Sequence, residues 1–253
     1  MVIFMQEYSL TSFRNHMDAL HITLREEQYG QFIRYYKLLT EWNAFMNLTA
    51  ITDYEEVVLK HFTDSLSLVK AFPEHDFLSG QEFTVMDVGT GAGFPAIPLK
   101  IAFPNLKITM LDSLNKRVKF LDEVIAQLGL KNITALHGRA EDAARKSELR
   151  ENFDLCVSRA VARLSTLSEY CLPFVKKDGY FIPYKSEKTE SELSEAEHAL
   201  SVLGGRVVRE TDFCLPGSEM YRKLVVIKKQ AVTPKKYPRK AGLPSKEPLG
   251  QKI

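Results

Sequence analysis

The chain has 253 residues, of which 45% are hydrophobic and 26% charged, a composition typical of soluble globular proteins. This length suffices for one large α/β domain, or for a smaller domain with an appendage. No apolar run approaches the roughly 18 residues of a membrane span, and the apolar start is too short for a signal peptide. The sequence therefore predicts neither a membrane-spanning nor a secreted protein.

The three cysteines, Cys156, Cys171 and Cys214, are odd in number and lack the spacing of metal ligands. We expect buried thiols in a reducing cytosol, with no disulfide framework and no metal site. The sequence thus predicts a cytoplasmic protein.

The charge is distributed unevenly along the chain, although its net value is only +2. Residues 228–253 contain eight Lys/Arg and one Glu, a net charge of +7, which leaves −5 for residues 1–227. A mildly acidic body with a basic terminal segment predicts that a polyanion binds at one face. On charge alone, a solubilising disordered end explains the segment equally well.

Residues 1–80 are expected to form a helical extension. Apolar residues from Leu24 to Trp42 recur at helical spacing. A second periodic stretch, 57–69, follows Asp53, which is placed as an N-cap with Glu56 three residues on.

Strands and helices alternate in the middle of the chain. The predicted strands are 83–88, 106–111, 133–137, 153–158, 180–184, 206–215 and 221–229. The predicted helices are 97–103, 116–128, 164–175, with a kink or stop at Pro173, and 187–203. This alternation predicts a mainly parallel, doubly wound α/β sheet, whose last two strands form an antiparallel edge hairpin. We divide the chain into the helical extension (1–80), a core (81–230) and a basic, Pro-containing tail (231–253).

A glycine loop, Gly89-x-Gly91-x-Gly93, joins the first strand to the following helix, where a ligand can approach the backbone closely. The third glycine comes one residue too early for a dinucleotide fingerprint, and Phe94 replaces a small residue. No Gly-Lys-Ser/Thr of a P-loop follows. Asp112, at the end of the second strand, is placed to accept the hydroxyls of a ribose. Together these residues favour S-adenosylmethionine over NAD, whereas a structural turn explains the loop alone equally well.

Three further residues fall at the same predicted edge of the sheet. Asp87 precedes the glycine loop and is placed to bond loop amides or a cofactor ammonium. Glu141 follows the third strand, where it can read an adenine edge, and Arg159 follows the fourth. In open α/β sheets the ligand lies beyond the carboxyl ends of the strands. Taken singly, Glu141 is equally explained as a helix N-terminal carboxylate and Arg159 as a surface ion pair.

Six motifs resemble those of the RsmG methyltransferases, also called glucose-inhibited division protein B (GidB). They are WNAFMNLT at 42–49, HFTDSL at 61–66, DVGTGAGFP at 87–95, DSLNKR at 112–117, SRAVA at 158–162 and PRKxGxPxKxPL at 238–249. The resemblance extends from about Leu24 to Leu249. It implies a Rossmann-like class I S-adenosylmethionine-dependent enzyme that methylates N7 of one guanine in 16S rRNA.

The resemblance also implies a set of cofactor contacts and partners. The residues that match the family's cofactor site are Gly89, Phe94, Asp112, Ser113, Leu114, Ala140, Glu141 and Arg159. The product is S-adenosyl-L-homocysteine, and the partner is 16S rRNA or a small-subunit ribosomal particle. We favour a monomer.

N7 of guanine carries a lone pair and no proton, so its methylation needs alignment in a dry pocket and no general base. His61 and Asp64, three residues apart, share a helical face, as do Asn43 and Asn47, four apart. His61, Asp64 and Asn47 are therefore positioning candidates at the pocket. We favour the structural alternatives, a buried His–Asp hydrogen bond and helix capping, over direct catalysis.

Cations near the predicted edge and in the tail are the candidates for contacts with RNA phosphates. They are Arg117, Arg139, Arg163 and Lys185, and in the tail Lys235, Lys236, Arg239, Lys240, Lys246 and Lys252. Solvated surface charge explains any single one of them. Prolines between the tail cations exclude a regular helix, so we expect an extended tail. It should pack on the body and line the RNA-facing side of the pocket, with the cofactor site independent of it.

Three alternative functions remain. A class I methyltransferase that acts on another RNA, such as tRNA, or on a protein would share the cofactor motifs. A nicotinamide dehydrogenase is disfavoured by the glycine spacing and by the lack of an acid or base for hydride transfer. An RNA-binding module without catalysis would leave the glycine loop unexplained.

Overall fold

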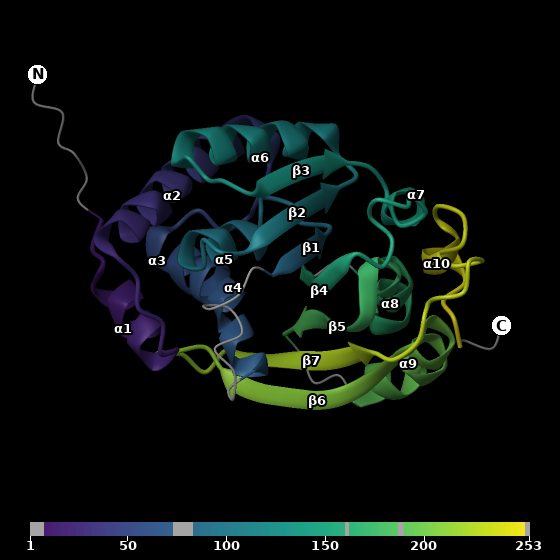
Figure 1. The fold of residues 1–253 in the computed structure, drawn as a ribbon. Helices are drawn as coiled ribbons and strands as arrows, with labels where there is room; N and C mark the ends of the chain where they lie inside the picture. Colours follow the sequence, from purple (N-terminus) through teal and green to yellow (C-terminus); the bar gives the residue numbers. More distant parts are fainter. Residues whose placement is uncertain (1–7, 73–82, 160–161, 187–189, 251–253) are drawn as a thin grey trace, which may run out of the picture.

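A seven-stranded sheet lies between two layers of helices (Figure 1). The computed structural model describes residues 8–72, 83–159, 162–186 and 190–250. The strands are β1 (Thr84–Val88), β2 (Lys107–Asp112), β3 (Ile133–His137), β4 (Phe153–Arg159), β5 (Val175–Lys185), β6 (Gly205–Cys214) and β7 (Tyr221–Lys229). The α-helices are α1 (Thr11–Ala19), α2 (Glu26–Met46), α3 (Tyr54–Val57), α4 (Asp64–Leu66), α5 (Ala96–Ala102), α6 (Asn115–Leu128), α7 (Ala140–Ala143), α8 (Leu164–Cys171), α9 (Glu190–Leu203) and α10 (Leu243–Lys246).

The strands lie in the order β3-β2-β1-β4-β5-β7-β6. Strands β1 to β5 run parallel, β7 is antiparallel to β5, and β6 is antiparallel to β7. The predicted doubly wound sheet with an antiparallel edge hairpin is therefore confirmed. The strand order reverses between β1 and β4, which is where ligands bind in open α/β sheets.

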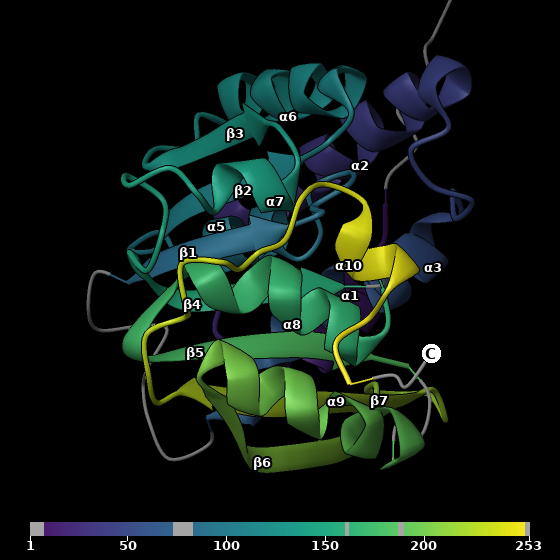
Figure 2. The same cartoon turned by 90° about the vertical axis from the view of Figure 1, so that its right-hand side faces the viewer.

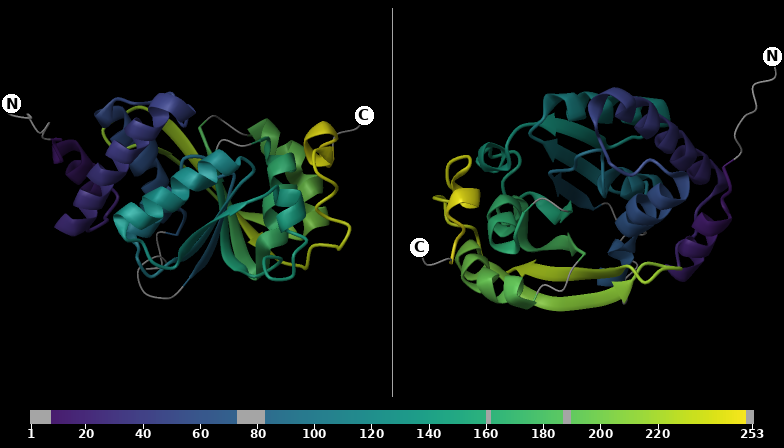
Figure 3. Two further views of the ribbon diagram at one scale, coloured as in Figure 1. Left: turned by 90° about the horizontal axis from the view of Figure 1, so that it is seen from above. Right: turned by 180° about the vertical axis from the view of Figure 1, so that it is seen from behind.

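Alternating side chains of the central strands belong to two hydrophobic cores, one on each face of the sheet. Val85 of β1 and Leu155 of β4 belong to the core with α2, α5 and α6. Their neighbours Met86 and Cys156 belong to the core with α8 and α9. A strand buried on both faces reads as a continuous apolar run, which is why these strands were predictable. Figure 3 shows the two helix layers on either side of the sheet.

The N-terminal helices pack on the first of these cores. Gln28 of α2 donates from Nε2 to the carbonyl of Ile101 at the end of α5, at 2.6 Å. The expected N-cap is confirmed, because the Asp53 carboxylate accepts the Glu56 amide at 3.0 Å. The stretch after it is helical but irregular: α3 continues into a π-helical segment (Val58–Thr63), then α4, then a 3₁₀ segment (Ser67–Ala71).

Helix α8 is shorter, and strand β5 longer, than predicted. The helix expected over 164–175 ends at Cys171 and is followed by a 3₁₀ turn, Leu172–Phe174. Pro173 lacks an amide proton and cannot continue an α-helix, so the chain turns there. The strand expected at 180–184 begins at Val175.

Two other expectations are corrected. Cys156 and Cys171 are buried as expected, but Cys214 is exposed, because it ends the edge strand β6, where alternate side chains face solvent. The tail is not extended throughout: it turns at 235–236 and at 241–242, and it forms one helical turn, α10, in which Pro244 occupies the first turn, where proline is tolerated.

Some predicted features lie outside the described residues. These are the boundary near 80 between the extension and the core, residues 187–189 of a predicted helix, and Lys252. Within the described ranges, no helix has both the length and the apolar character needed to cross a membrane.

Candidate functional site

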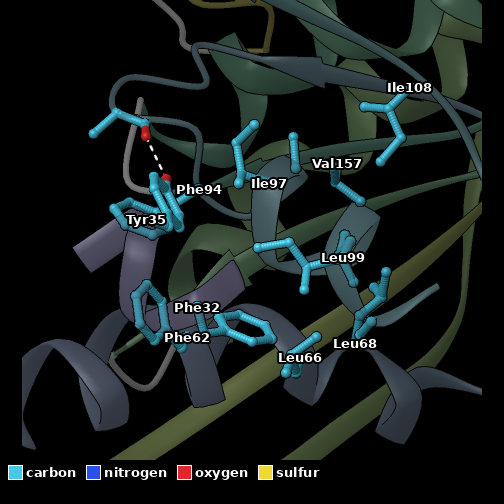
Figure 4. Close-up of a cluster of buried hydrophobic side chains, with 14 of the residues drawn as sticks. Phe32, Tyr35, Phe62, Leu66, Leu68, Phe94, Ile97, Leu99, Ile108 and Val157 are labelled. Carbon is cyan, nitrogen blue, oxygen red and sulfur yellow. Dashed lines mark hydrogen bonds between the residues drawn. The ribbon is translucent and has the colours of Figure 1, made fainter. Parts of the chain in front are cut away.

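The glycine loop is held against helix α2 of the N-terminal extension. Gly93 has a φ of +98°, and a Cβ there would lie 2.5 Å from Cγ1 of Ile97 and 2.9 Å from the hydroxyl oxygen of Tyr35. Only glycine fits this position without displacing its neighbours. The Tyr35 hydroxyl donates to the carbonyl of Ala92, the dashed contact in Figure 4. The extension therefore shapes the loop directly.

Asp112 braces the same loop from the end of β2. Its Oδ2 accepts the Gly91 amide and its Oδ1 the Leu114 amide, each at 2.9 Å. The Arg117 guanidinium lies 3.3 Å from Oδ2, so this candidate for RNA contact forms an ion pair with Asp112. A carboxylate oxygen accepts two bonds, so Oδ1 retains a position for a further donor.

Asp87, at the end of β1, is completely buried below the loop. Its Oδ2 accepts the Thr90 hydroxyl at 2.6 Å and the Ala96 amide at 3.2 Å. Its Oδ1 has no hydrogen-bond partner among the described residues. Burial raises the pKa of this carboxyl to about 7. A buried acceptor without a donor is costly, and a cationic N–H group would satisfy it.

A first cavity, which we call the loop cavity, opens beside the glycine loop with a volume of about 240 Å³. Its walls come from the carboxyl ends of β1, β2 and β3, from α8 and from the tail: Val88, Gly89, Leu111, Ser113, Gly138, Arg139, Ala140, Glu141, Tyr170, Gly242 and Ser245. Of the predicted cofactor residues, Gly89, Ser113, Ala140 and Glu141 thus line one cavity. The other predicted cofactor residues are not among these walls: Asp87, Gly91, Gly93, Phe94, Asp112, Leu114, which is 43% exposed, and Arg159.

The tail reaches the loop cavity, contrary to the expectation that the predicted cofactor site is independent of it. The Gly242 amide donates to Oε1 of Glu141 at 2.8 Å. Ser245 of α10 lines the same cavity beside Tyr170 of α8. Figure 2 shows the tail, in yellow, crossing beside α8 towards α7 and α10. The sequence carried no signal for this contact, because Glu141 and Gly242 are 101 residues apart.

A second cavity, which we call the basic cavity, lies beyond the carboxyl ends of β4 and β5 and has a volume of about 450 Å³. Its lining combines four cations with two carboxylates: Ile51, Lys60, His61, Asp64, Arg159, Ala162, Leu167, Tyr184, Lys185, Ser186, Glu192 and Arg222. Four of these residues were candidates from sequence: His61 and Asp64 as positioning residues, Arg159 as a cofactor contact and Lys185 as an RNA contact. Arg159 lines this cavity and is not among the walls of the loop cavity. Arg222 was missed, because nothing in the sequence of β7 distinguishes it from the other cations of the edge hairpin.

Asp64 holds two arginines at the wall of the basic cavity. Its Oδ2 accepts from Nη1 of Arg159 at 2.9 Å, and its Oδ1 accepts from Nε of Arg222 at 2.8 Å. Asp64 itself is only 4% exposed. The carboxylate therefore fixes the orientation of both guanidinium groups.

His61 lies between the basic cavity and the glycine loop. Its ring stacks on Phe94 with a centroid distance of 4.5 Å, and the Arg159 guanidinium lies 5.1 Å from the centre of the same Phe94 ring. Nδ1 of His61 is 3.3 Å from Nη2 of Arg159, and Nε2 is 2.9 Å from the Thr49 hydroxyl. Burial and the positive charge of Arg159 lower the pKa of His61 to about 4. The ring is therefore neutral at pH 7, and Arg159 takes the place of the expected His–Asp bond.

The polar helical face expected from Asn43 and Asn47 does not form. Helix α2 ends at Met46, and Asn47 is its left-handed C-cap, with a φ of +50° and an exposed side chain. Asn43 Oδ1 accepts the Thr49 amide at 2.9 Å. Asn43 therefore holds the chain that follows the helix, Asn47 is the C-cap residue, and Asn47 is not a wall of the basic cavity.

The RNA candidates fall into paired and exposed groups. Arg163 lies 3.5 Å from Glu195, Lys185 lies 2.6 Å from Glu192, and Arg239 lies 2.8 Å from the fully buried Glu169. Arg239 thus has a structural contact. Arg163 is also exposed, and the other exposed candidates are Arg139, Lys235, Lys236, Lys240 and Lys246.

The linings of the two cavities include residues of the neighbouring strands β1 and β4, where the strand order reverses. Ser158 of β4 donates from its hydroxyl to the carbonyl of Val88 at 2.7 Å. Val88 lines the loop cavity, and Arg159, next to Ser158, lines the basic cavity. A small ligand in one cavity and a basic recognition site in the other would therefore lie beside β1 and β4, respectively.

Comparison with known proteins is consistent with this arrangement. A sequence profile of the GidB family, described as rRNA small subunit methyltransferase G, matches residues 28–219. Ribosomal RNA small subunit methyltransferase G of Lachnoclostridium phytofermentans is 56% identical over 242 residues, 96% of this chain and 98% of the relative. The protein of that name from Lactobacillus johnsonii is 53% identical, over 89% of this chain and 93% of the relative.

Solved structures support the fold. A SAM-dependent methyltransferase from Aquifex aeolicus superposes with a TM-score of 0.51 at 23% identity, covering 72% of this chain and 97% of that one. The predicted class I methyltransferase fold is therefore confirmed. Since the family profile spans most of the chain and two relatives share half of its residues, the chain belongs to the GidB family, rRNA small subunit methyltransferase G.

Proposed function

We propose that this protein transfers a methyl group from S-adenosylmethionine to N7 of one guanine in 16S rRNA. The observation that carries the proposal is the pair of neighbouring cavities at the carboxyl edge of the parallel strands. One is built from the glycine loop and strand ends, and the other is lined with cations. The names of the relatives supply the substrate class, small-subunit rRNA.

The residues of the loop cavity and the loop behind it fit S-adenosylmethionine, which supplies an electrophilic methyl group on a sulfonium when bound. Oδ1 of Asp87 would take the methionine ammonium, because it is a buried acceptor without a donor among the described residues. Asp112 would hold the ribose hydroxyls, since its Oδ1 retains an acceptor position. Glu141 and Ala140 would contact the adenine and Gly89 lines the cavity, while Gly91, Gly93 and Phe94 belong to the loop behind it.

The basic cavity would take the target guanosine. Guanine presents two acceptors, N7 and O6, on the edge that faces the major groove, and arginine and lysine are the donors that match it. Lys60, Arg159 and Arg222 supply such donors, and Leu167 and Tyr184 supply apolar surface for the ring. A donor to O6 would leave N7 free to face the loop cavity.

The reaction requires no general base from the protein, because N7 has no proton to remove. The residues have to exclude water and hold the two reactants in line, which can supply about 7–11 kcal/mol of the barrier reduction. His61 suits this purpose because it is neutral at pH 7 and does not repel the cationic methylated ring. His61 and Asp64 are positioning residues here: both hold Arg159 against Phe94.

The exposed cations Arg139, Lys235, Lys236, Lys240 and Lys246 would contact phosphates around the pocket. The substrate would be free 16S rRNA or a small-subunit particle, and the enzyme a cytoplasmic monomer. The division into an extension, a core and a tail also remains a prediction.

Radiolabelled S-adenosylmethionine, incubated with the purified protein and with separate RNA and protein acceptors, tests the proposal. We expect label in 16S rRNA, offered free or as small subunits, and none in 23S rRNA, tRNA or ribosomal protein. Label in tRNA or protein alone would favour the alternative methyltransferases. RNA binding without any label transfer, in the presence of bound cofactor, would favour a binding module.

A further inference from the structure

The tail motif PRKxGxPxKxPL packs closely against the body of the protein (Figure 2). Arg150 donates from Nη2 to the carbonyl of Thr233 at 2.7 Å and from Nη1 to that of Tyr237 at 2.9 Å. The Tyr237 side chain is only 8% exposed. These contacts fix the start of the tail before the motif begins.

Arg239 then anchors the motif on a buried carboxylate. Glu169 of α8 is fully buried, and its Oε2 accepts from Nη2 of Arg239 at 2.8 Å while its Oε1 accepts the Arg239 amide at 2.7 Å. The same Nη2 also donates to the carbonyl of Glu247 at 2.7 Å, which closes the turn from its far side. Such bidentate, charge-assisted pairs are geometrically specific.

The turn held by Arg239 presents its polar groups to the loop cavity. Gly242 has a φ of +82°, and its amide donates to Oε1 of Glu141 at 2.8 Å. Ser245 lines the cavity, and the carbonyl of Pro244 accepts the Thr166 hydroxyl of α8 at 3.1 Å. Arg239, Gly242 and Pro244 of the motif thus place one turn of chain beside Glu141.

We propose that this turn, residues 239–247, is part of the cofactor site: Gly242 fixes the Glu141 carboxylate for the purine, and Ser245 forms the opposite wall. The inference rests on the proposed function, since it takes the loop cavity as the adenosine site. Cofactor affinity then depends on a segment whose composition suggested RNA contact alone. The exposed cations Lys240 and Lys246 belong to the same turn, so the RNA-facing charge and the cofactor wall are one structural unit.

Calorimetric titration of S-adenosylhomocysteine into full-length variants tests the proposal. A left-handed φ disfavours alanine, so Gly242→Ala should displace the amide from Glu141. We expect roughly tenfold weaker binding, the effect of losing one hydrogen bond to a charged group. Ser245→Phe places a ring in the cavity from an exposed position and should weaken binding at least as much, without disturbing the core.

The matched controls lie in the β6–β7 turn. Gly217 has a φ of +69°, and the nearest atom to its added Cβ is Nε2 of His16 at 3.6 Å, so Gly217→Ala introduces the same backbone strain elsewhere. Ser218→Phe adds the same ring to that turn. Both controls should bind S-adenosylhomocysteine within about twofold of the wild type, as expected for sites without shared contacts.

Wild-type affinity in folded Gly242→Ala and Ser245→Phe proteins would overturn the inference. Asp112→Ala separates this failure from that of the proposed function. If Asp112→Ala weakens binding while the two tail variants do not, the loop cavity still holds the cofactor and only the tail has been misassigned. If none of the three weakens binding, the cofactor does not bind in the loop cavity.

Discussion

Replacing Asp64 with Asn should destabilise the protein markedly, although the two side chains have nearly the same size. The Asp64 carboxylate bonds Arg159 at 2.9 Å and Arg222 at 2.8 Å. An asparagine loses the charge and turns an amide N–H towards one guanidinium. Removing one partner of a buried ion pair costs about 3–5 kcal/mol. The arginine side chains are 15% and 17% exposed, so water solvates part of the charge that loses its partner. We therefore expect Asp64→Asn to lower the free energy of unfolding by about 2–4 kcal/mol.

A double-mutant cycle measured by urea unfolding tests this reasoning. The variants are Asp64→Asn, Arg222→Met and the pair together. Since the two residues share a buried contact, we expect a coupling energy of about 1–3 kcal/mol. The matched control is Arg163 with Glu195, which lie 3.5 Å apart with side chains 67% and 45% exposed. For that pair the coupling should stay below about 1 kcal/mol.

The functional part of the prediction follows from the place of Asp64 in the basic cavity. Asp64→Asn should raise KM for RNA and lower kcat, while S-adenosylhomocysteine affinity stays close to that of the wild type, because Asp64 does not line the loop cavity. A coupling energy equal to that of the exposed control pair would refute the ion-pair argument. A loss of cofactor affinity instead of RNA affinity would refute the assignment of the two cavities.

Three further predictions address the loop and the pH dependence. Asp112→Ala should weaken S-adenosylmethionine binding by about 1.5–3 kcal/mol, as loss of charge-assisted hydrogen bonds does; unchanged affinity by calorimetry would remove Asp112 from the site. Gly93→Ala should lower stability by about 1–3 kcal/mol in thermal unfolding, because its Cβ would lie 2.5 Å from Ile97, and a wild-type Tm would contradict the close packing. The pKa of His61 is about 4 in the folded protein and 6.5 ordinarily, so the unfolded chain binds more protons between these pH values. The free energy of unfolding should therefore fall by up to about 3 kcal/mol as the pH drops from 6.5 to 4. His61→Gln should flatten that dependence in denaturant titrations at pH 7 and pH 5, and an identical slope would show that another group is responsible.

The central strands were predictable because they are buried on both faces. Residues 83–88 and the middle of 221–229, Leu224–Ile227, contain apolar runs, and the structure has strands at Thr84–Val88 and Tyr221–Lys229. The beginning of β5 was not predictable in this way. Residues 175–179 contain two lysines, an aspartate and a glycine, and only pairing with β4 makes Val175 part of a strand.

The site was predictable where sequence order and spatial order agree. Gly89, Asp112, Glu141 and Arg159 each follow a strand, and the carboxyl ends of parallel strands meet at one edge. Arg222 and Gly242 were missed because each reaches the site from a segment remote in sequence. Arg222 contacts a residue 158 positions earlier and Gly242 one 101 positions earlier, and such pairings depend on how the edge hairpin and the tail pack.

The chemical position of the methyl group is the most direct test of the proposed reaction. 16S rRNA, methylated by the purified protein with S-adenosylmethionine, should be treated with alkaline borohydride and then aniline, which cleave RNA where a guanine carries a cationic N7-methyl ring. The account predicts cleavage at one guanine, absent when the protein or the cofactor is left out. Methyl label recovered on an exocyclic amine or a ribose oxygen, with no cleavage, would contradict it.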